Sequence, residues 1–121
     1  MAKQKKKPDN PDPMAITQAE ELVLSTLRYG REFYGLAICE AVKQASGGSR
    51  TIGLSRVYSV LKRLEEKGYV TSRWGDEAPS ELTGARRRYY KITGAGSNAL
   101  DIKEAYLKGL GTFEPVLRGA T

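Results

Sequence analysis

The sequence predicts a mainly α-helical fold that carries one small β-hairpin. Apolar residues recur at helical spacing in four segments, and each segment is bounded by a cap or by glycine. Two short runs rich in β-formers flank a polar loop between the third and fourth segments. A length of 121 residues suits one domain with a single modest core. These observations place a domain over residues 14–93 and a C-terminal helix with its tail over residues 94–121.

The first 13 residues, MAKQKKKPDNPDP, precede the first helix. They are rich in lysine and proline and show no apolar periodicity, so we expect a disordered basic arm. Thr17 and Glu20 then have the spacing of a capping box, which predicts a helix that begins at Thr17 and ends near Gly30. A tail that only aids solubility and an arm that touches a DNA backbone are equally consistent with residues 1–13.

The second helix is predicted within residues 34–50 and should end at the glycine pair 47–48. One of its faces is apolar and is expected to be buried: Ile38, Cys39, Val42 and Ala45. Since no neighbouring charge would stabilise a thiolate, Cys39 is expected to be a packed core thiol rather than a redox sensor.

The third helix should begin close to Ser55 and end at Gly68, with two sides of different character. At 100° per residue, four apolar residues fall in one arc: Val57, Val60, Leu61 and Leu64. The remaining arc offers hydroxyls, cations and a tyrosine: Ser55, Arg56, Tyr58, Ser59, Lys62 and Arg63. Acidic residues come only at the C-terminal end, which keeps the N-terminal end positive.

Two strands, 69–74 and 86–93, are predicted to form the hairpin. Val70, Tyr90 and Ile92 supply an inward face, and Lys91 points outward. The run at 86–88 places three arginines side by side where the second strand leaves the loop. Guanidinium groups held out on a rigid ribbon suit phosphate oxygens or a minor groove. The cations expected at such a surface are Arg73, Arg86, Arg87, Arg88 and Lys91.

Thr93 is predicted to cap the fourth helix. This helix carries a wide apolar stripe: Ala99, Leu100, Tyr106, Leu107 and Leu110. A three-helix core with a hairpin leaves little surface that could cover all five side chains. We therefore expect the stripe to form a homodimer, with packing inside one chain as the alternative.

Charge and composition narrow the functional class. The chain has a net charge of +6, and most of it lies in residues 50–93, which hold ten basic and five acidic residues. Such a concentrated positive charge favours nucleic acid as a partner. The chain has no histidine and one cysteine, so we expect no enzyme, no metal site and no cofactor. It also has no apolar run long enough to span a membrane and no signal-peptide pattern, so a cytoplasmic, nucleoid-associated location is expected.

The segments YGLAICEAV, SRVYSVLKRLEEKGYV and GARRRYYKITGAG resemble the PadR family of bacterial transcriptional regulators, which have a winged helix-turn-helix fold. The likeness covers residues 17 to 110. VYSVLKRLEEKGYV is similar to the family's Leu-Tyr-Pro-Thr-Leu helix and the Leu-Glu-x-x-Gly that follows it, although Ser59 stands where proline is usual. RRRYYKIT is similar to the family's Arg-Arg-x-Tyr-Tyr-x-Leu-Thr strand. The segment RWGDE and its long loop are similar to cyanobacterial members, among them a circadian clock regulator.

The resemblance implies a homodimeric DNA-binding regulator, most often a repressor, on an inverted-repeat operator. It implies that Tyr58 lies on the recognition helix, that residues 86–88 are the basic part of the wing, and that Thr93 opens a dimerisation helix. A pocket for a small aromatic effector between the subunits could be lined by Trp74, Tyr106 and Phe113. Each of these side chains could equally be part of the core. Two other classes stay open: a basic protein-interaction module and a winged helix that binds RNA.

Overall fold

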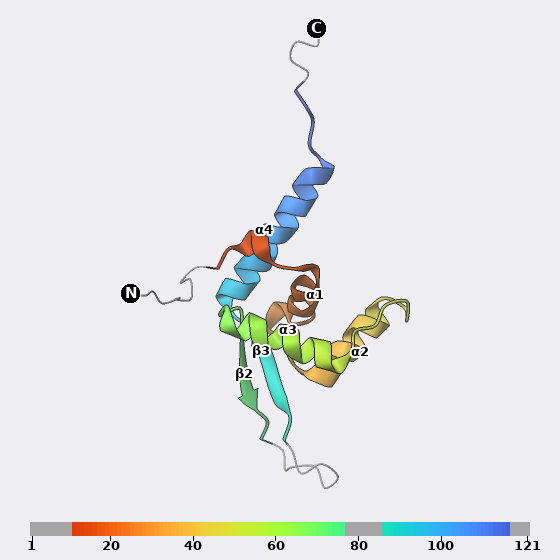
Figure 1. The fold of residues 1–121 in the computed structure, drawn as a ribbon, viewed down its shortest axis with the longest axis vertical. Coiled ribbons are helices and arrows are strands. Elements are labelled where there is room, and N and C mark those ends of the chain that lie inside the picture. The colour runs from red at the N-terminus through yellow and green to blue at the C-terminus, as the bar shows by residue number, and fades with distance from the viewer. Residues whose placement is uncertain (1–10, 77–85, 117–121) are drawn as a thin grey trace, which may run out of the picture.

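The computed structural model describes residues 11–76 and 86–116, and within these ranges the helices and strands follow the predicted order. The elements are η1 (Pro13–Ala15), α1 (Gln18–Thr26), η2 (Arg28–Gly30), β1 (Glu32–Tyr34), α2 (Gly35–Ala45), α3 (Leu54–Glu66), β2 (Val70–Trp74), β3 (Arg88–Ile92) and α4 (Gly94–Gly111). The β2–β3 hairpin leaves one end of the helical body, and the far half of α4 leaves the other end (Figure 1). The fold is therefore the predicted one, mainly α-helical with a small sheet.

Most of the predicted basic arm, residues 1–10, lies outside the described residues. The last residues of the arm, from Pro11 onward, are bound to the folded part of the chain. Asp12 caps η1 by accepting a hydrogen bond from the Met14 N–H at 3.0 Å, and the Tyr69 hydroxyl donates to the Pro11 carbonyl at 3.3 Å. On the other side of η1, the Lys103 ammonium on α4 donates to the Ile16 carbonyl at 2.9 Å. The chain is thus tied to α4 before its first α-helix begins.

The capping box of α1 is confirmed. The Glu20 N–H donates to the Thr17 hydroxyl at 3.1 Å, and the Thr17 N–H donates to a Glu20 carboxylate oxygen at 3.0 Å. The predicted end near Gly30 is wrong, because α1 stops at Thr26 and a 3-10 turn follows. Tyr29 and Gly30 both have positive φ, 66° and 77°, which a right-handed helix does not allow. This left-handed pair turns the chain into β1.

The second helix, α2, ends before the glycine pair as predicted, but its buried face is narrower than predicted. Ile38 and Val42 are buried, whereas Ala45 is exposed. Ala45 lies in the last turn, beyond the reach of the core. Cys39 is partly buried against the core, and this burial raises the pKa of its thiol, as expected for a packed cysteine.

The sheet has three strands where the sequence predicts two. Its order is β1-β3-β2 and all pairs are antiparallel, with Phe33 opposite Tyr90 and Ser72 opposite the same residue on the other side. The predicted faces are confirmed: Val70 and Tyr90 are buried, Ile92 is partly buried against the core, and Lys91 is exposed. Strand β1 has only three residues, too few to show an alternating pattern, and its partner strand lies far along the sequence.

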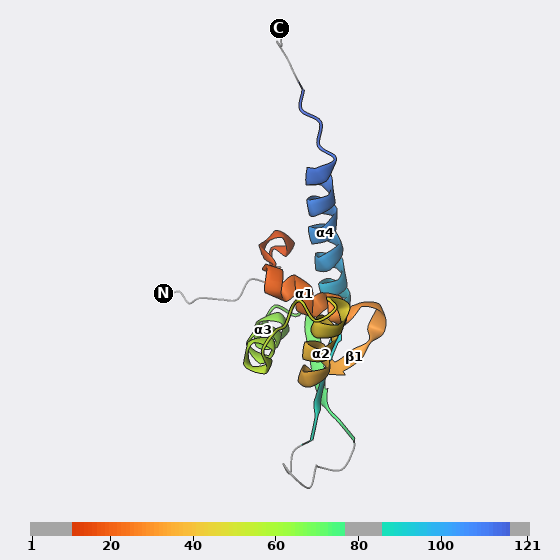
Figure 2. The same ribbon diagram turned by 90° about the vertical axis from the view of Figure 1, so that its right-hand side faces the viewer.

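The core is a single cluster between α1, α2, α3, the first half of α4 and the inner face of the sheet, with α3 on one side of the sheet (Figure 2). Two residues of the predicted dimer stripe, Ala99 and Leu100, belong to this core, with 2% and 0% of their surface exposed. They pack inside the chain because the first half of α4 lies against the body, so they cannot be part of an open face. No helix in the described ranges combines the length and the apolar character needed to cross a membrane.

Gly96 is where α4 comes closest to the rest of the fold. A β-carbon at this position would lie 2.2 Å from the Tyr69 carbonyl oxygen and 3.0 Å from the Ile92 side chain. Backbone cannot give way as a flexible side chain can, so α4 would have to move. We expect Gly96→Ala to lower the free energy of unfolding by about 1–3 kcal/mol, as overpacking does.

Urea unfolding measures this effect, and Gly109→Ala is the matched control. A β-carbon at Gly109 meets nothing within 4 Å on the same helix, and alanine favours helix over glycine by up to about 1 kcal/mol. The control should therefore be neutral or more stable. Equal stability changes in the two variants would show that α4 does not pack on the Tyr69 backbone.

Candidate nucleic-acid interface

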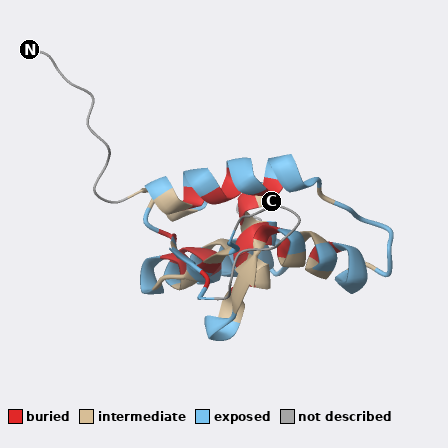
Figure 3. Cartoon of the chain, turned by 90° about the horizontal axis from the view of Figure 1, so that it is seen from below, coloured by how far each residue is buried: buried red, intermediate tan, exposed pale blue. Residues whose placement is uncertain are grey.

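The outward side of α3 is polar and exposed. Its apolar side is buried as predicted, because Val57, Leu61 and Leu64 have no exposed surface. On the opposite side Ser55, Ser59 and Lys62 are exposed. The two sides are separated along the whole helix (Figure 3). Gly53 caps α3 without a side-chain hydrogen bond, and no acidic residue lies in its first turn. The helix therefore presents hydroxyls and cations with a positive N-terminal end.

Tyr58 flanks this polar side next to the start of α2. Its ring covers Gly35 so closely that a β-carbon there would lie 2.8 Å from the ring and from the hydroxyl oxygen. About half of the Tyr58 surface, 45%, remains exposed. The tyrosine is therefore fixed by the first residue of α2 while its outer edge faces solvent.

Arg56 and Arg63 lie on the other flank of α3, and Arg63 has a partner inside the protein. Its Nε–H donates to Glu20 at 3.3 Å, and the Lys67 ammonium donates to both oxygens of the same carboxylate at 2.9 and 3.0 Å. The Glu20 residue is fully buried, while 46% of the Arg63 side chain is exposed. Glu20 thus orients Arg63 and leaves the ends of its guanidinium open to solvent.

Burial acts to raise the pKa of Glu20, but the hydrogen bond from the Thr17 N–H and the charges of Lys67 and Arg63 outweigh it. The pKa is therefore below the ordinary value of 4.5. A lowered carboxyl pKa means stability that is present above the unfolded-state pKa and is lost as the pH falls through the folded one. We expect Glu20→Gln to be less stable than the wild type by about 1–3 kcal/mol at pH 7.

This stability gap between wild type and Glu20→Gln should shrink when urea unfolding is repeated at pH 4 and then at pH 3. Glu21→Gln removes the same charge one residue along α1 and serves as control. A gap that is the same at all three pH values would mean that the Glu20 charge contributes nothing to stability.

The arginine run divides into residues with different surroundings. Arg88 is the first residue of β3, and its Nε–H donates to the Ser72 hydroxyl at 3.0 Å, which itself donates to Glu65 on α3 at 2.7 Å. Its guanidinium also lies 5.0 Å from the centre of the Trp74 ring. Arg88 therefore joins the hairpin to α3. Part of the Arg88 guanidinium is therefore already bound within the protein, which leaves only the rest of it for the predicted contact with DNA.

The outer face of the sheet holds a row of aromatic rings and guanidiniums. Tyr34 and Tyr89 meet edge to face at 5.6 Å, Arg87 lies 4.5 Å above the Tyr34 ring, and Arg73 lies 5.1 Å from the Tyr89 ring. Arg73 also forms two hydrogen bonds to Glu32, at 2.9 and 3.0 Å. Arg86 and Lys91 are exposed. The wing cations thus form a positive edge whose side chains are held by stacking and pairing.

Three residues of this interface were not predicted from the sequence: Glu32, Tyr34 and Ser72. Each holds a cation in place: Glu32 pairs with Arg73, the Tyr34 ring lies under Arg87, and the Ser72 hydroxyl accepts from Arg88. Glu32 and Tyr34 lie on β1, and only pairing with β3 brings them to the arginines. EFY is too short to show an alternating pattern, so no signal in the sequence indicates that Glu32 and Tyr34 share a face with the arginines.

The other predicted site residues lie at the ends of the molecule. Tyr106, Leu107 and Leu110 are exposed on the far half of α4, at 46%, 44% and 58%. Trp74 and Phe113, candidates for an effector pocket, are also exposed, but β2 and the far end of α4 lie at opposite ends of the chain (Figure 1). One chain therefore does not bring Trp74 together with Tyr106 and Phe113.

Three helices, a polar third helix and a basic hairpin beside it define the winged helix-turn-helix class of DNA-binding proteins. Residues 23–102 match the model of the transcriptional regulator PadR-like family, and the chain belongs to this family. Comparison with curated proteins gives no significant match.

Solved structures agree with this assignment. A PadR family transcription regulator from Clostridium difficile is 27% identical, with 79% of this chain and 93% of that chain covered and a TM-score of 0.65. Bacillus subtilis PadR in complex with operator DNA is 23% identical over 84% of this chain and 51% of that chain, with a TM-score of 0.61. Pex from Synechococcus is 24% identical over 74% and 79%, with a TM-score of 0.55. The last two show the shared fold alone.

Proposed function

We propose that this PadR-family regulator binds duplex DNA as a homodimer at an inverted-repeat operator and acts as a repressor. The observation that carries the proposal is the exposed polar side of α3, flanked by Tyr58 and Arg56 and continued by the wing cations. An α-helix fits the major groove, where hydroxyl and guanidinium groups can read base edges. Repression follows if the bound dimer covers a promoter, and DNA binding implies association with the nucleoid.

The residues take roles according to where they lie. We assign base contacts to Ser55, Ser59 and the open end of the Arg63 guanidinium, with Arg56 beside them. Tyr58 and Lys62 would contact phosphates at the edges of the groove. In the wing, Arg86, Arg87 and Lys91 would hold the neighbouring backbone or minor groove. Arg73, which pairs with Glu32, and Arg88, which donates to Ser72, would act mainly by keeping the wing in place.

The far half of α4 is the proposed dimer contact. Its exposed apolar side chains are Ile102, Tyr106, Leu107 and Leu110. A two-fold axis would bury the same residues on both chains at once. A small aromatic effector bound between the two chains would then contact Tyr106 and Phe113. Trp74 lies at the opposite end of the same chain, so only the Trp74 of the other chain could reach this effector.

The direct test is a titration of the protein with duplex DNA and with duplex RNA of the same sequence. We expect DNA to be bound and RNA to compete poorly, because the deep, narrow major groove of A-form RNA does not admit a helix. Equal competition would favour an RNA-binding winged helix. No affinity for either would favour a module that binds an acidic protein.

Arg87→Ala tests the wing. Because a phosphate contact carries little sequence information, the substitution should weaken binding to operator and to random DNA by similar factors. The plot of log affinity against log salt should flatten by about one unit per lost contact, so by about two per dimer. Lys108→Ala, far along α4, is the control and should leave the slope unchanged. An unchanged slope in Arg87→Ala would remove Arg87 from the interface.

A further inference from the structure

Trp74 is the last residue of β2, and 56% of its surface is exposed. This end of β2 projects beyond the helical body (Figure 1). A single exposed apolar side chain is common on soluble proteins and does not by itself indicate a site. Trp74 differs from such a residue in how it is held and in which part of the fold it faces.

Two contacts fix the position of Trp74. Arg88 is its cross-strand partner in the pairing of β2 with β3, and the Arg88 guanidinium lies 5.0 Å from the centre of the indole ring. The Gly75 N–H donates to the Arg87 carbonyl at 2.7 Å, which continues the pairing one residue past the strand. The ring is therefore in place before any partner arrives, and little conformational freedom is lost when a partner binds.

Trp74 lies on the face of the hairpin that turns toward α3. Side chains alternate between the two faces of a strand, so Trp74 shares a face with Ser72 and with the buried Val70. The Ser72 hydroxyl donates to Glu65 on α3 at 2.7 Å, and this contact joins the hairpin to the third helix. The indole ring thus continues the α3-facing side of the hairpin beyond the helix itself.

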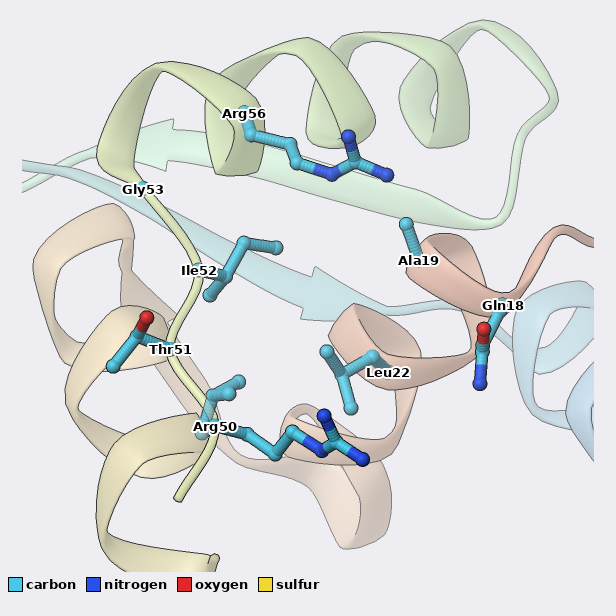
Figure 4. Close-up of a pocket in the computed structure, with 9 residues that line it drawn as sticks. Gln18, Ala19, Leu22, Arg50, Thr51, Ile52, Gly53 and Arg56 are labelled. Atoms are coloured by element: carbon cyan, nitrogen blue, oxygen red, sulfur yellow. The ribbon is translucent and has the colours of Figure 1, made fainter. Parts of the chain in front are cut away.

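The wing joins α3 on the side opposite to Arg56. In Figure 4 the Arg56 side chain extends toward Ala19 on α1. Glu65 comes nine residues after Arg56, which is about two and a half turns and places it on the other side of the helix. With α3 in the major groove, the wing therefore reaches past one edge of that groove, toward the minor groove beside it.

The surroundings of the ring on the wing are positively charged. Arg86 and Lys91 are exposed. Arg73 pairs with Glu32, which holds the pKa of Arg73 above its ordinary value, and the charge of Asp76 acts in the same direction. These two carboxylates therefore act on a cation of the wing itself. An exposed aromatic ring among cations suits a polyanion that also offers apolar surface, as DNA does with its sugars and base edges.

On the basis of the DNA-binding function proposed above, we propose that Trp74 contacts the minor groove beside each half-site, with its ring against deoxyribose and base edges. In this groove an A·T pair shows only acceptors, whereas a G·C pair adds the amino group of guanine. The indole N–H is a donor, so it suits the acceptors of an A·T pair and meets a second donor at a G·C pair. Trp74 thereby gives the protein a preference for A·T pairs next to its half-sites.

Trp74 is the single tryptophan of the chain, so its fluorescence reports on this contact alone. With a saturating operator duplex, obtained by selection from random DNA, the acrylamide quenching constant should fall by about half or more, because DNA would cover the exposed ring. The matched control combines Trp74→Phe with Phe113→Trp and moves the indole beyond the end of α4, to a residue that is 71% exposed. Its quenching should be the same with and without DNA.

Binding to two versions of the operator tests the base preference. The wild type should bind a duplex with A·T flanks about tenfold more tightly or better than one with G·C flanks, since each of two wings supplies one base-edge contact. Trp74→Ala should bind both duplexes about as weakly as the wild type binds the G·C version. Trp74→Phe, which keeps a ring but lacks the N–H, should lie between them. Because Trp74 is exposed, the thermal midpoint of both variants should stay close to that of the wild type.

Two results would overturn the assignment of Trp74 and leave the proposed function standing. One is tight operator binding in which acrylamide quenches Trp74 as well as in the free protein. The other is a preference for A·T flanks that persists in Trp74→Ala, which would assign that preference to arginines in a narrow minor groove. Failure to bind any duplex would refute the proposed function, and the assignment of Trp74 with it.

Discussion

Replacing both Ser55 and Ser59 with alanine should reduce the preference of the dimer for its operator over random DNA by about a thousandfold. Each base-edge contact contributes roughly 1–3 kcal/mol of discrimination, and two serines on each of two subunits supply four such contacts. Even the lower end of that range gives about 4 kcal/mol, and each 1.4 kcal/mol is a factor of ten. Affinity for random DNA should change little, because phosphate contacts from Lys62 and the wing remain.

Parallel titrations of operator and random duplex at one salt concentration measure this ratio. Both serines are exposed and lie away from the buried side of α3, so the thermal midpoint should be equal or slightly higher with the better helix former alanine. Ser49→Ala, an exposed serine outside α3, is the control and should keep the full ratio. An unchanged ratio in the double variant would mean that α3 does not read the bases through its hydroxyls.

Tyr106→Asp should abolish dimer formation at micromolar concentration. The substitution places a carboxylate in the middle of the exposed apolar part of α4, where a two-fold axis brings two such charges together in an apolar seam. Affinity for the full operator should fall by about a hundredfold or more, since linked half-sites gain roughly that much from being bound together. Affinity for an isolated half-site should stay within a few-fold of the wild type.

Sedimentation measures the first part of this prediction, with a species near 13.3 kDa expected for the variant. Tyr29→Asp makes the same chemical change at a tyrosine that is 87% exposed on the body of the fold. Aspartate tolerates the left-handed backbone found there, so this control should remain a dimer. A dimeric Tyr106→Asp protein that binds the inverted repeat tightly would place the subunit contact elsewhere, with α1 the next candidate.

Local features of the fold could be predicted from sequence because local chemistry decides them. The capping box at Thr17 and Glu20 depends on residues three apart, and both of its hydrogen bonds form as expected. The division of α3 into a buried and a polar side follows from periodicity over 13 residues. Thr93 caps α4 for the same local reason.

Features that depend on distant partners could not be predicted in this way. Strand β1 exists because Glu32 to Tyr34 pair with residues in β3. Ala99 and Leu100 belong to one periodic stripe with Tyr106, yet the body of the fold covers the first two and leaves the third exposed. Periodicity shows that one face of α4 is apolar. It does not show where along the helix the neighbouring elements end.

The surroundings of the arginines in the candidate interface also depend on residues that are distant in the sequence. The run of three arginines at 86–88 suggests three equivalent contacts, but Arg88 is bound to Ser72 and Arg87 stacks on Tyr34. These partners come from β2 and β1. The sequence places the charge at the wing correctly, and the sheet decides how much of it faces outward.

We propose that two copies of α3, related by the α4 contact, read two half-sites of one operator. Selection of bound fragments from random duplex DNA by the wild-type protein tests it most directly. We expect an enriched inverted repeat whose half-site centres lie about one helical turn apart, roughly 34 Å. A single asymmetric motif, or binding without any enriched sequence, would contradict it.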